Sequence, residues 1–187
     1  LDVDAHVTTV LFNDQYKMLY NRRELKDVSK MTDKDYTPGG MTALLDAVGR
    51  TIHKMDMVSG IHRKDKGNKV LFVIITDGEE NDSKEYTYAD VKKLIKDRQE
   101  NAGWEFIFLG ANIDAAAEAE NLGIDRDRAV KYKNTGSGVR ANFMAVAELS
   151  DSLAKSGRVS DEWKETVEKD EDDAADKQSA AVTLHRR

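Results

Sequence analysis

One run of the sequence is almost unbroken in apolar residues: Lys69–Thr76 (KVLFVIIT). A strand with one face in water alternates apolar and polar residues, whereas a continuous apolar run of this length is typical of a strand covered on both faces. Trp104–Gly110 (WEFIFLG) has the same character. The two runs predict neighbouring buried strands of a parallel sheet, and such neighbours need a crossover segment between them, usually a helix.

Amphipathic segments separate the apolar runs. Tyr88–Arg98 lies between the two buried strands and places Val91, Leu94 and Ile95 at helical spacing. The other expected elements are strands at His6–Asn13, Lys17–Leu25 and Ala129–Tyr132, and helices at Leu44–Met55, after Asp114 and at Val139–Leu153, the last with Phe143, Val146 and Leu149 inward. Strands alternating with helices predict an α/β fold with a doubly wound, mostly parallel sheet and helices on both faces.

We expect one sheet to contain the strands at His6–Asn13, Val70–Thr76 and Glu105–Leu109. In open sheets of this kind, ligands bind outside the carboxyl ends of the strands. The strand ends of interest are therefore Asn13-Asp14, Thr76-Asp77-Gly78 and Gly110-Ala111-Asn112.

Composition excludes several kinds of site and partner. With Cys 0, the chain has no thiolate ligand, cysteine nucleophile or disulfide, which fits a reducing cytoplasm. A formal net charge of -6 does not suggest a duplex nucleic-acid binder. No apolar run approaches the roughly 20 residues that cross a bilayer. We expect a cytoplasmic protein that has neither nucleic-acid nor membrane partners.

The length of 187 residues fits one domain, since domains commonly have roughly 100–200 residues. We assign residues 1–158 to this domain and residues 159–187 to an acidic tail. Glu168–Asp176 (EKDEDDAAD) has almost no large apolar side chain whose burial would offset the entropy of ordering. The tail is therefore expected to be disordered or partly helical.

Two short motifs place oxygen ligands at the ends of predicted elements. Pro38-Gly39-Gly40-Met41-Thr42 opens a helix, and Thr76-Asp77-Gly78-Glu79-Glu80-Asn81 closes a buried strand. Each motif also has a plainer interpretation, because Thr commonly caps helices and Asp commonly stabilises turns.

Taken together, the motifs resemble the von Willebrand factor A family, closest to its small stand-alone bacterial members. Trp104–Asp114 (WEFIFLGANID) is also similar to that subgroup, and the resemblance runs from about Leu1 to Leu153. It implies a metal-ion-dependent adhesion site in which oxygens hold Mg²⁺, or Mn²⁺ or Ca²⁺. By this resemblance Thr42 and Asp77 are metal ligands, and the partner-binding rim comprises Gly40, Glu79, Glu80 and Asn81.

One motif of the family is missing. Its first metal motif, Asp-x-Ser-x-Ser, ends the first strand, whereas Asp27-Val28-Ser29 has Met31 in the last position and precedes the glycine loop. His6–Asn13 then corresponds to the family's second strand, so the first strand and helix are absent and the metal site is incomplete. The absent strand belongs beside the one ending at Thr76. A longer protein, a strand supplied in trans and a local rearrangement would each explain the gap.

The sequence leaves two functions open. The first is a metal-dependent module that binds an acidic side chain of a protein partner, with weak or no Mg²⁺ binding by this chain. The second is a metal-free scaffolding domain of the same fold. An enzyme is not expected, because no nucleophile–base pair or Gly-x-Ser-x-Gly elbow is present.

Overall fold

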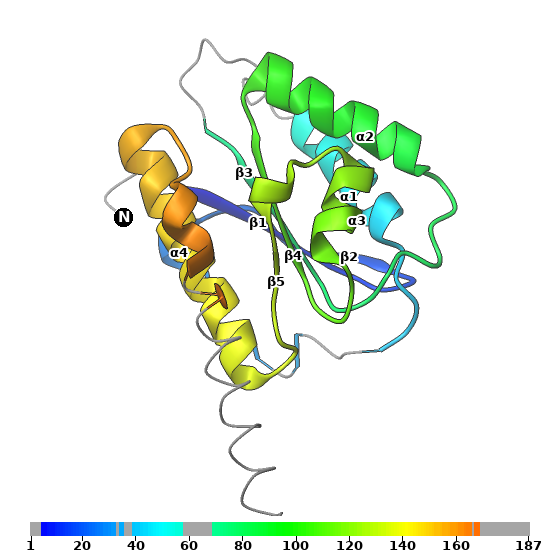
Figure 1. Cartoon of the computed structure of the whole chain (residues 1–187), viewed down its shortest axis with the longest axis horizontal. Coiled ribbons are helices and arrows are strands. Elements are labelled where there is room, and N and C mark those ends of the chain that lie inside the picture. The colour runs from blue at the N-terminus through cyan, green and yellow to red at the C-terminus, as the bar shows by residue number, and fades with distance from the viewer. Residues whose placement is uncertain (1–4, 33, 36–38, 58–68, 166, 169–187) are drawn as a thin grey trace, which may run out of the picture.

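A three-stranded parallel sheet forms the centre of the fold (Figure 1). The computed structural model describes residues 5–32, 34–35, 39–57, 69–165 and 167–168. The strands are β3 (Leu71–Thr76), β4 (Glu105–Gly110) and β5 (Ala129–Lys131), in the order β3-β4-β5. All three runs were expected as strands, and the mixed α/β class with parallel strands is confirmed.

Helices cover both faces of this sheet. Phe106 and Phe108 of β4 pack into a core cluster with α1 (Leu44–Asp56), α2 (Tyr88–Asp97) and α3 (Ala115–Leu122). The alternate residues of β4 pack against α4 (Gly136–Ser156) on the opposite face. The continuous apolar run of β4 follows from this arrangement, since each of its faces is buried.

Side-chain caps set the starts of three helices. Thr87 and Asp90 form a capping box at α2. Asp114 Oδ1 accepts from Ala117 N at 3.0 Å at the start of α3, as expected. Thr135 Oγ1 accepts from Gly138 N at 3.1 Å, so α4 begins at Gly136, three residues before the position expected from its apolar spacing.

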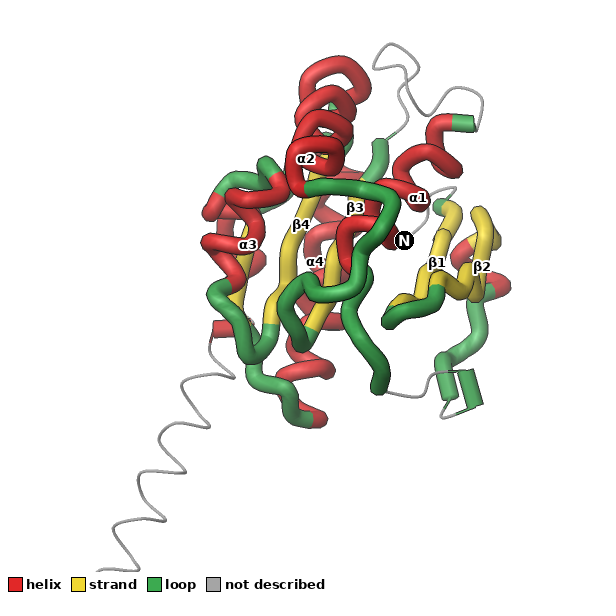
Figure 2. Tube along the Cα trace, turned by 90° about the vertical axis from the view of Figure 1, so that its right-hand side faces the viewer, coloured by secondary structure: helices red, strands yellow, loops and turns green. Residues whose placement is uncertain are grey.

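The first two strands form a separate sheet. β1 (His6–Phe12) and β2 (Tyr16–Glu24) pair as an antiparallel hairpin. Figure 2 shows this hairpin beyond β3, on the side away from β4. The expectation of one sheet was therefore wrong, because no backbone ladder joins β1 to β3 among the described residues.

Contacts with α1 hold the hairpin in place of a ladder. Ala43 N donates to Asn13 O at 2.9 Å, just before α1 begins. The hydroxyls of Tyr16 and Thr51 lie 3.1 Å apart, and Thr8 Oγ1 lies 3.6 Å from Met55 Sδ. These hydrogen bonds attach the hairpin along the helix, and Phe12 of β1 also packs against the core cluster that contains Ile74 of β3.

The inward face of α4 differs from the expected one. Leu149 is buried and Val146 is partly buried, but Phe143 is 58% exposed. The prediction for Phe143 was wrong because Ala145 and Asn142 take the inward positions around it.

The segment after α4 also contributes to the core. Val159, Trp163 and Val167, which we placed in the tail, pack on the α4 face of the sheet. A 3-10 turn, Asp161–Trp163, lies among them. Residues 169–187 fall outside the described residues. No helix in the described part of the chain is long and apolar enough to cross a membrane.

Candidate functional site

Three polar side chains meet at the carboxyl edge of the sheet. Asp77 follows β3, Asn112 follows β4 and Asn134 comes shortly after β5. Asn134 Nδ2 donates to Asp77 Oδ2 at 3.0 Å, and Asn112 Nδ2 lies 3.5 Å from Asp77 O. Adjacent parallel strands end at the same edge, so three segments distant in sequence converge on Asp77.

Thr42 belongs to the same corner. Its backbone is fixed by Asn81, whose N donates to Thr42 O at 3.0 Å and whose Oδ1 accepts from Thr42 N at 2.8 Å. A Cβ placed on Gly78 would lie 3.2 Å from the Thr42 hydroxyl. The hydroxyl therefore sits directly against the turn that carries Asp77, and the Asn81 pair does not use it.

Gly40 lies where the loop before α1 passes the β1–β2 turn. Its φ of +91° is in a region that favours glycine. A Cβ there would lie 2.7 Å from Asp14 Oδ1 and 2.9 Å from Asn13 Nδ2. Asn13 Nδ2 donates to Gly39 O at 3.0 Å. This close approach brings the Asp14 carboxylate to the loop that leads to Thr42. Pro38 of the same motif lies outside the described residues.

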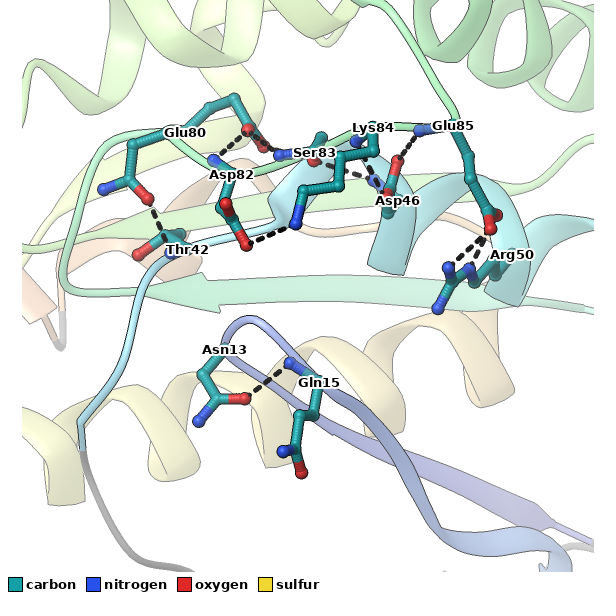
Figure 3. A network of polar contacts seen from close by, with 11 residues as sticks. Asn13, Gln15, Thr42, Asp46, Arg50, Glu80, Asp82, Ser83, Lys84 and Glu85 are labelled. Carbon is teal, nitrogen blue, oxygen red and sulfur yellow. Dashed lines mark hydrogen bonds and ion pairs between the residues drawn. The ribbon is translucent and has the colours of Figure 1, made fainter.

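The Glu80 carboxylate is occupied by the chain itself (Figure 3). Its Oε1 accepts from the backbone N of Asp82 at 2.9 Å and of Ser83 at 2.7 Å. Its Oε2 accepts from Leu45 N at 3.0 Å and Ser83 Oγ at 2.7 Å. Leu45 N is one of the helix N-terminal donors that have no partner within the helix. Glu80 therefore caps α1 from outside.

Asp46 makes the reciprocal connection from α1 to the loop. Its Oδ2 accepts from Lys84 N at 3.0 Å, and its Oδ1 accepts from Glu85 N at 2.9 Å and Tyr86 N at 3.0 Å. Burial acts to raise the pKa of this carboxyl, but the three backbone N–H groups and the Arg50 charge outweigh it and hold the pKa below its ordinary value. The loop depends on an ionised Asp46.

Further contacts continue this connection along α1. Asp46 N donates to Ser83 Oγ at 3.1 Å, and Arg50 binds both carboxylate oxygens of Glu85, at 2.7 and 2.8 Å. A Cβ on Gly49 would lie 2.5 Å from the Tyr86 ring, so glycine lets this ring pack on the helix. A cleft of about 130 Å³ separates the loop from the hairpin, lined by Phe12, Asp14, Gln15, Tyr16, Ala43, Asp46, Ala47, Arg50, Asp82, Lys84 and Glu85.

The structure places the expected site residues in two groups. Gly40, Thr42, Asp77 and Asn81 gather at the carboxyl edge, and Glu79 is exposed beside them. Glu80 instead turns its carboxylate inward to α1. The sequence interpretation missed Asp46, Ser83 and Asn134. One indication of Asp46 and Ser83 was available in the sequence. Asp46 is an acidic residue near a helix start, and an acid–x–x–Ser segment, Glu80–Ser83, follows the next strand.

No group of three or more His, Cys, Asp or Glu side chains is arranged to hold a metal within the ranges described above. Thr42 and Asp77 together supply one hydroxyl and one carboxylate, which is not a group of three such side chains. A metal role for Thr42 and Asp77 stays a prediction.

No family model matches this sequence, and neither a curated protein nor a solved structure was found to match it.

Proposed function

We propose that this chain is a von Willebrand factor A-like, doubly wound domain that binds a protein partner through a divalent cation at its carboxyl edge. The observation that supports this most is the position of the Thr42 hydroxyl against Gly78, in the turn that contains Asp77. Two loops that are far apart in sequence thereby present a hydroxyl and a carboxylate to the same corner.

The donor types suit a hard cation. Mg²⁺ takes oxygen ligands, keeps several waters and is commonly held by one or two carboxylates. Asn134 binds Oδ2 of the exposed Asp77 carboxylate, and Oδ1 lies outside that hydrogen bond. With Thr42 this makes two protein ligands, which favours weak binding of Mg²⁺, Mn²⁺ or Ca²⁺.

The surrounding charges make partner binding conditional on the cation. Asp14, Asp77 and Glu79 lie at or beside this corner and would repel an acidic side chain. A bound cation supplies the positive charge and the open ligand position for a partner's carboxylate. Asn81 holds the Thr42 backbone, and Gly40 lets the loop pass close to Asp14.

A metal-free scaffold is the second candidate, and a specific observation favours it. The Asn134–Asp77 hydrogen bond and the two-bond Asn81–Thr42 pair already tie the loops together. Under this alternative the corner is a closed joint between elements, and a partner uses another surface.

Calorimetric titration with MgCl₂ separates the two. We expect weak, roughly millimolar binding that Asp77→Ala abolishes. Glu79→Ala is the matched control, because it removes a neighbouring exposed carboxylate and should change affinity less than about threefold. Binding that survives Asp77→Ala contradicts the proposed site. No binding by any form of the chain contradicts the proposal and supports the scaffold.

A further inference from the structure

A small cleft lies on the outward side of α1, between the loop Glu80–Tyr86 and the turn of the β1–β2 hairpin. Figure 3 shows the loop above it and the hairpin turn below it. Asp46 and Arg50 line the cleft, on the side of α1 opposite to Leu44 and Val48, which pack into the core. Its described lining includes neither β3 nor the Thr42–Asp77 corner, so the cleft is a separate feature of the surface.

Part of the lining is apolar, and the space matches one long side chain. Phe12, Ala43 and Ala47 contribute the apolar surface, and both alanines are buried. The volume of about 130 Å³ corresponds to roughly four water molecules at about 30 Å³ each. The methylene groups and terminal ammonium of a lysine side chain fill such a space, whereas a whole amino acid or a helix is too large for it.

Negative charge exceeds positive charge around the cleft. Its lining has four carboxylates and two basic side chains. Arg50 is held by Glu85, and Lys84 Nζ lies 3.6 Å from Asp82 Oδ2. Asp14 is exposed, and its carboxylate has no hydrogen bond or ion pair among the described residues. The cleft therefore attracts a cationic group.

Two of the lining groups already receive an ammonium from this chain. Asp82 is paired with Lys84, whose side chain is 78% exposed, and an exposed pair of this kind is weak. The Tyr16 ring has Lys54 Nζ 4.4 Å from its centroid, a distance at which ring and cation attract one another. A carboxylate and an aromatic ring of the cleft are therefore placed where ammonium groups bind.

We propose that the cleft binds a lysine side chain of a partner protein. The methylene groups of this lysine would lie on Phe12 and Ala47, and its ammonium would replace that of Lys84 beside Asp82. Asp14, at the same cleft, gains a counter-charge. Because only a side chain fits, the backbone of the partner stays outside, which favours a lysine on a protein surface over a free amino acid.

The chemistry favours lysine over arginine. A guanidinium is held best by a carboxylate that accepts two parallel hydrogen bonds, and the Glu85 carboxylate already holds Arg50 in this way. An ammonium is a compact charge that needs no such pairing. The inference does not rest on the cation proposal, because Thr42 and Asp77 are not part of the cleft.

An NMR titration of the whole chain in metal-free buffer tests the proposal. The probe is N-acetyl-L-lysine N-methylamide, which should shift the backbone amides of Gln15, Ala47 and Lys84 in a saturable way, with a Kd on the order of 1 mM. N-acetyl-L-norleucine N-methylamide has the same methylene groups without the charge and should bind at least about fivefold more weakly. The corresponding arginine derivative should also bind more weakly than the lysine probe.

Three exposed side chains provide matched variants. Asp14→Asn removes the unpaired charge and should weaken binding of the lysine probe about fivefold. Lys84→Ala removes the competing ammonium and should strengthen binding about threefold. Asp27→Asn is the control, because it removes an exposed carboxylate beyond the opposite end of the hairpin and should change the Kd less than about 1.5-fold.

Several results would overturn the assignment. Equal affinity for the lysine and norleucine probes would show that the cleft does not select charge. Equal effects of Asp14→Asn and Asp27→Asn, or weaker binding after Lys84→Ala, would place the ammonium elsewhere. Tighter binding of the arginine probe, or no saturable shift at the cleft residues, would contradict the lysine site itself.

Discussion

The outer edge of β3 and the loop Glu80–Tyr86 follow one another closely in the chain, yet they differ in how their backbone N–H groups are paired. In the loop, the carboxylates of Glu80 and Asp46 accept hydrogen bonds from five consecutive backbone N–H groups, those of residues 82–86. Along the β3 edge, Leu71, Val73 and Ile75 meet no strand among the described residues.

The comparison shows two uses of the same backbone chemistry. A loop without regular structure becomes a fixed part of the fold when side chains from α1 and from the loop itself take its donors. A regular strand whose edge is not paired leaves alternate donors without a ladder partner. The loop should therefore respond to loss of its carboxylates, and amide exchange along β3 should differ between the residues that face β4 and those that face the open edge.

The largest effect is expected for Asp46→Ala, which removes the acceptor of three backbone N–H groups. The free energy of unfolding should fall by about 3 kcal/mol, since each hydrogen bond to a charged group contributes roughly 1.5–3 kcal/mol and the three are not additive. Urea denaturation measures it. Asp46→Asn retains one acceptor oxygen and should lose about half as much. A loss below about 1 kcal/mol for Asp46→Ala would show that the loop is held by other contacts.

A smaller loss is expected for Glu80→Ala. This change uncaps Leu45 N and removes the acceptor of Ser83, at about 2 kcal/mol. Glu79→Ala, one residue earlier and exposed, should stay within about 0.5 kcal/mol of the parent. Similar losses for the two variants would mean that Glu80 does not act as the cap of α1.

Asn142→Leu changes a buried residue of α4 and should act in the opposite direction. It replaces a buried amide that has no partner among the described residues with an apolar side chain of similar volume. The free energy of unfolding should rise by about 1 kcal/mol, because an unsatisfied buried polar group is removed. Thermal denaturation of the chain alone checks this. A clear loss of stability would mean that the amide has a partner in the isolated chain.

The smallest effect is a pH dependence that belongs to the loop alone. The pKa of Asp46 is lowered on folding from its ordinary value of 3.8, because the backbone N–H groups and Arg50 outweigh burial. Its contribution to stability is therefore complete above about pH 5 and is lost as the pH falls through the lowered pKa. The stability difference between the parent and Asp46→Asn should be constant from about pH 5 to 7 and shrink below about pH 4. A difference that grows on acidification would contradict the sign.

Much of the fold followed from local sequence patterns. Lys69–Thr76 was expected as a buried strand because its apolar run is continuous, and β3 occupies most of it. Leu44, Val48 and Ile52 gave α1 by their spacing of four, and Asp114 marked the start of α3. Such patterns show which face of an element is apolar and whether it repeats as in a helix or a strand. They therefore also predicted helices on both faces of the sheet.

Patterns of this kind do not report which elements become neighbours. The apolar character of β1 did not reveal that β2 is its only strand partner among the described residues. The spacing of Phe143 did not reveal that its side chain is 58% exposed. The carboxylate network was hidden for the same reason. Asp46 resembles an ordinary acid in the first turn of a helix, and its partners lie 38 to 40 residues away. Thr42 and Asp77 were predicted as site residues because their loops carry recognisable motifs. Asn134 lies in no such motif and was not predicted.

Native-state amide exchange of the chain alone tests the contrast most directly, because one experiment reports both regions. Exchange should be slow at Lys84, Glu85 and Tyr86, whose N–H groups bond to Asp46, although two of these residues are exposed. It should be faster at Leu71, Val73 and Ile75 than at Phe72 and Ile74 within the same strand. Fast exchange throughout residues 84–86, together with uniform protection along β3, would contradict the account.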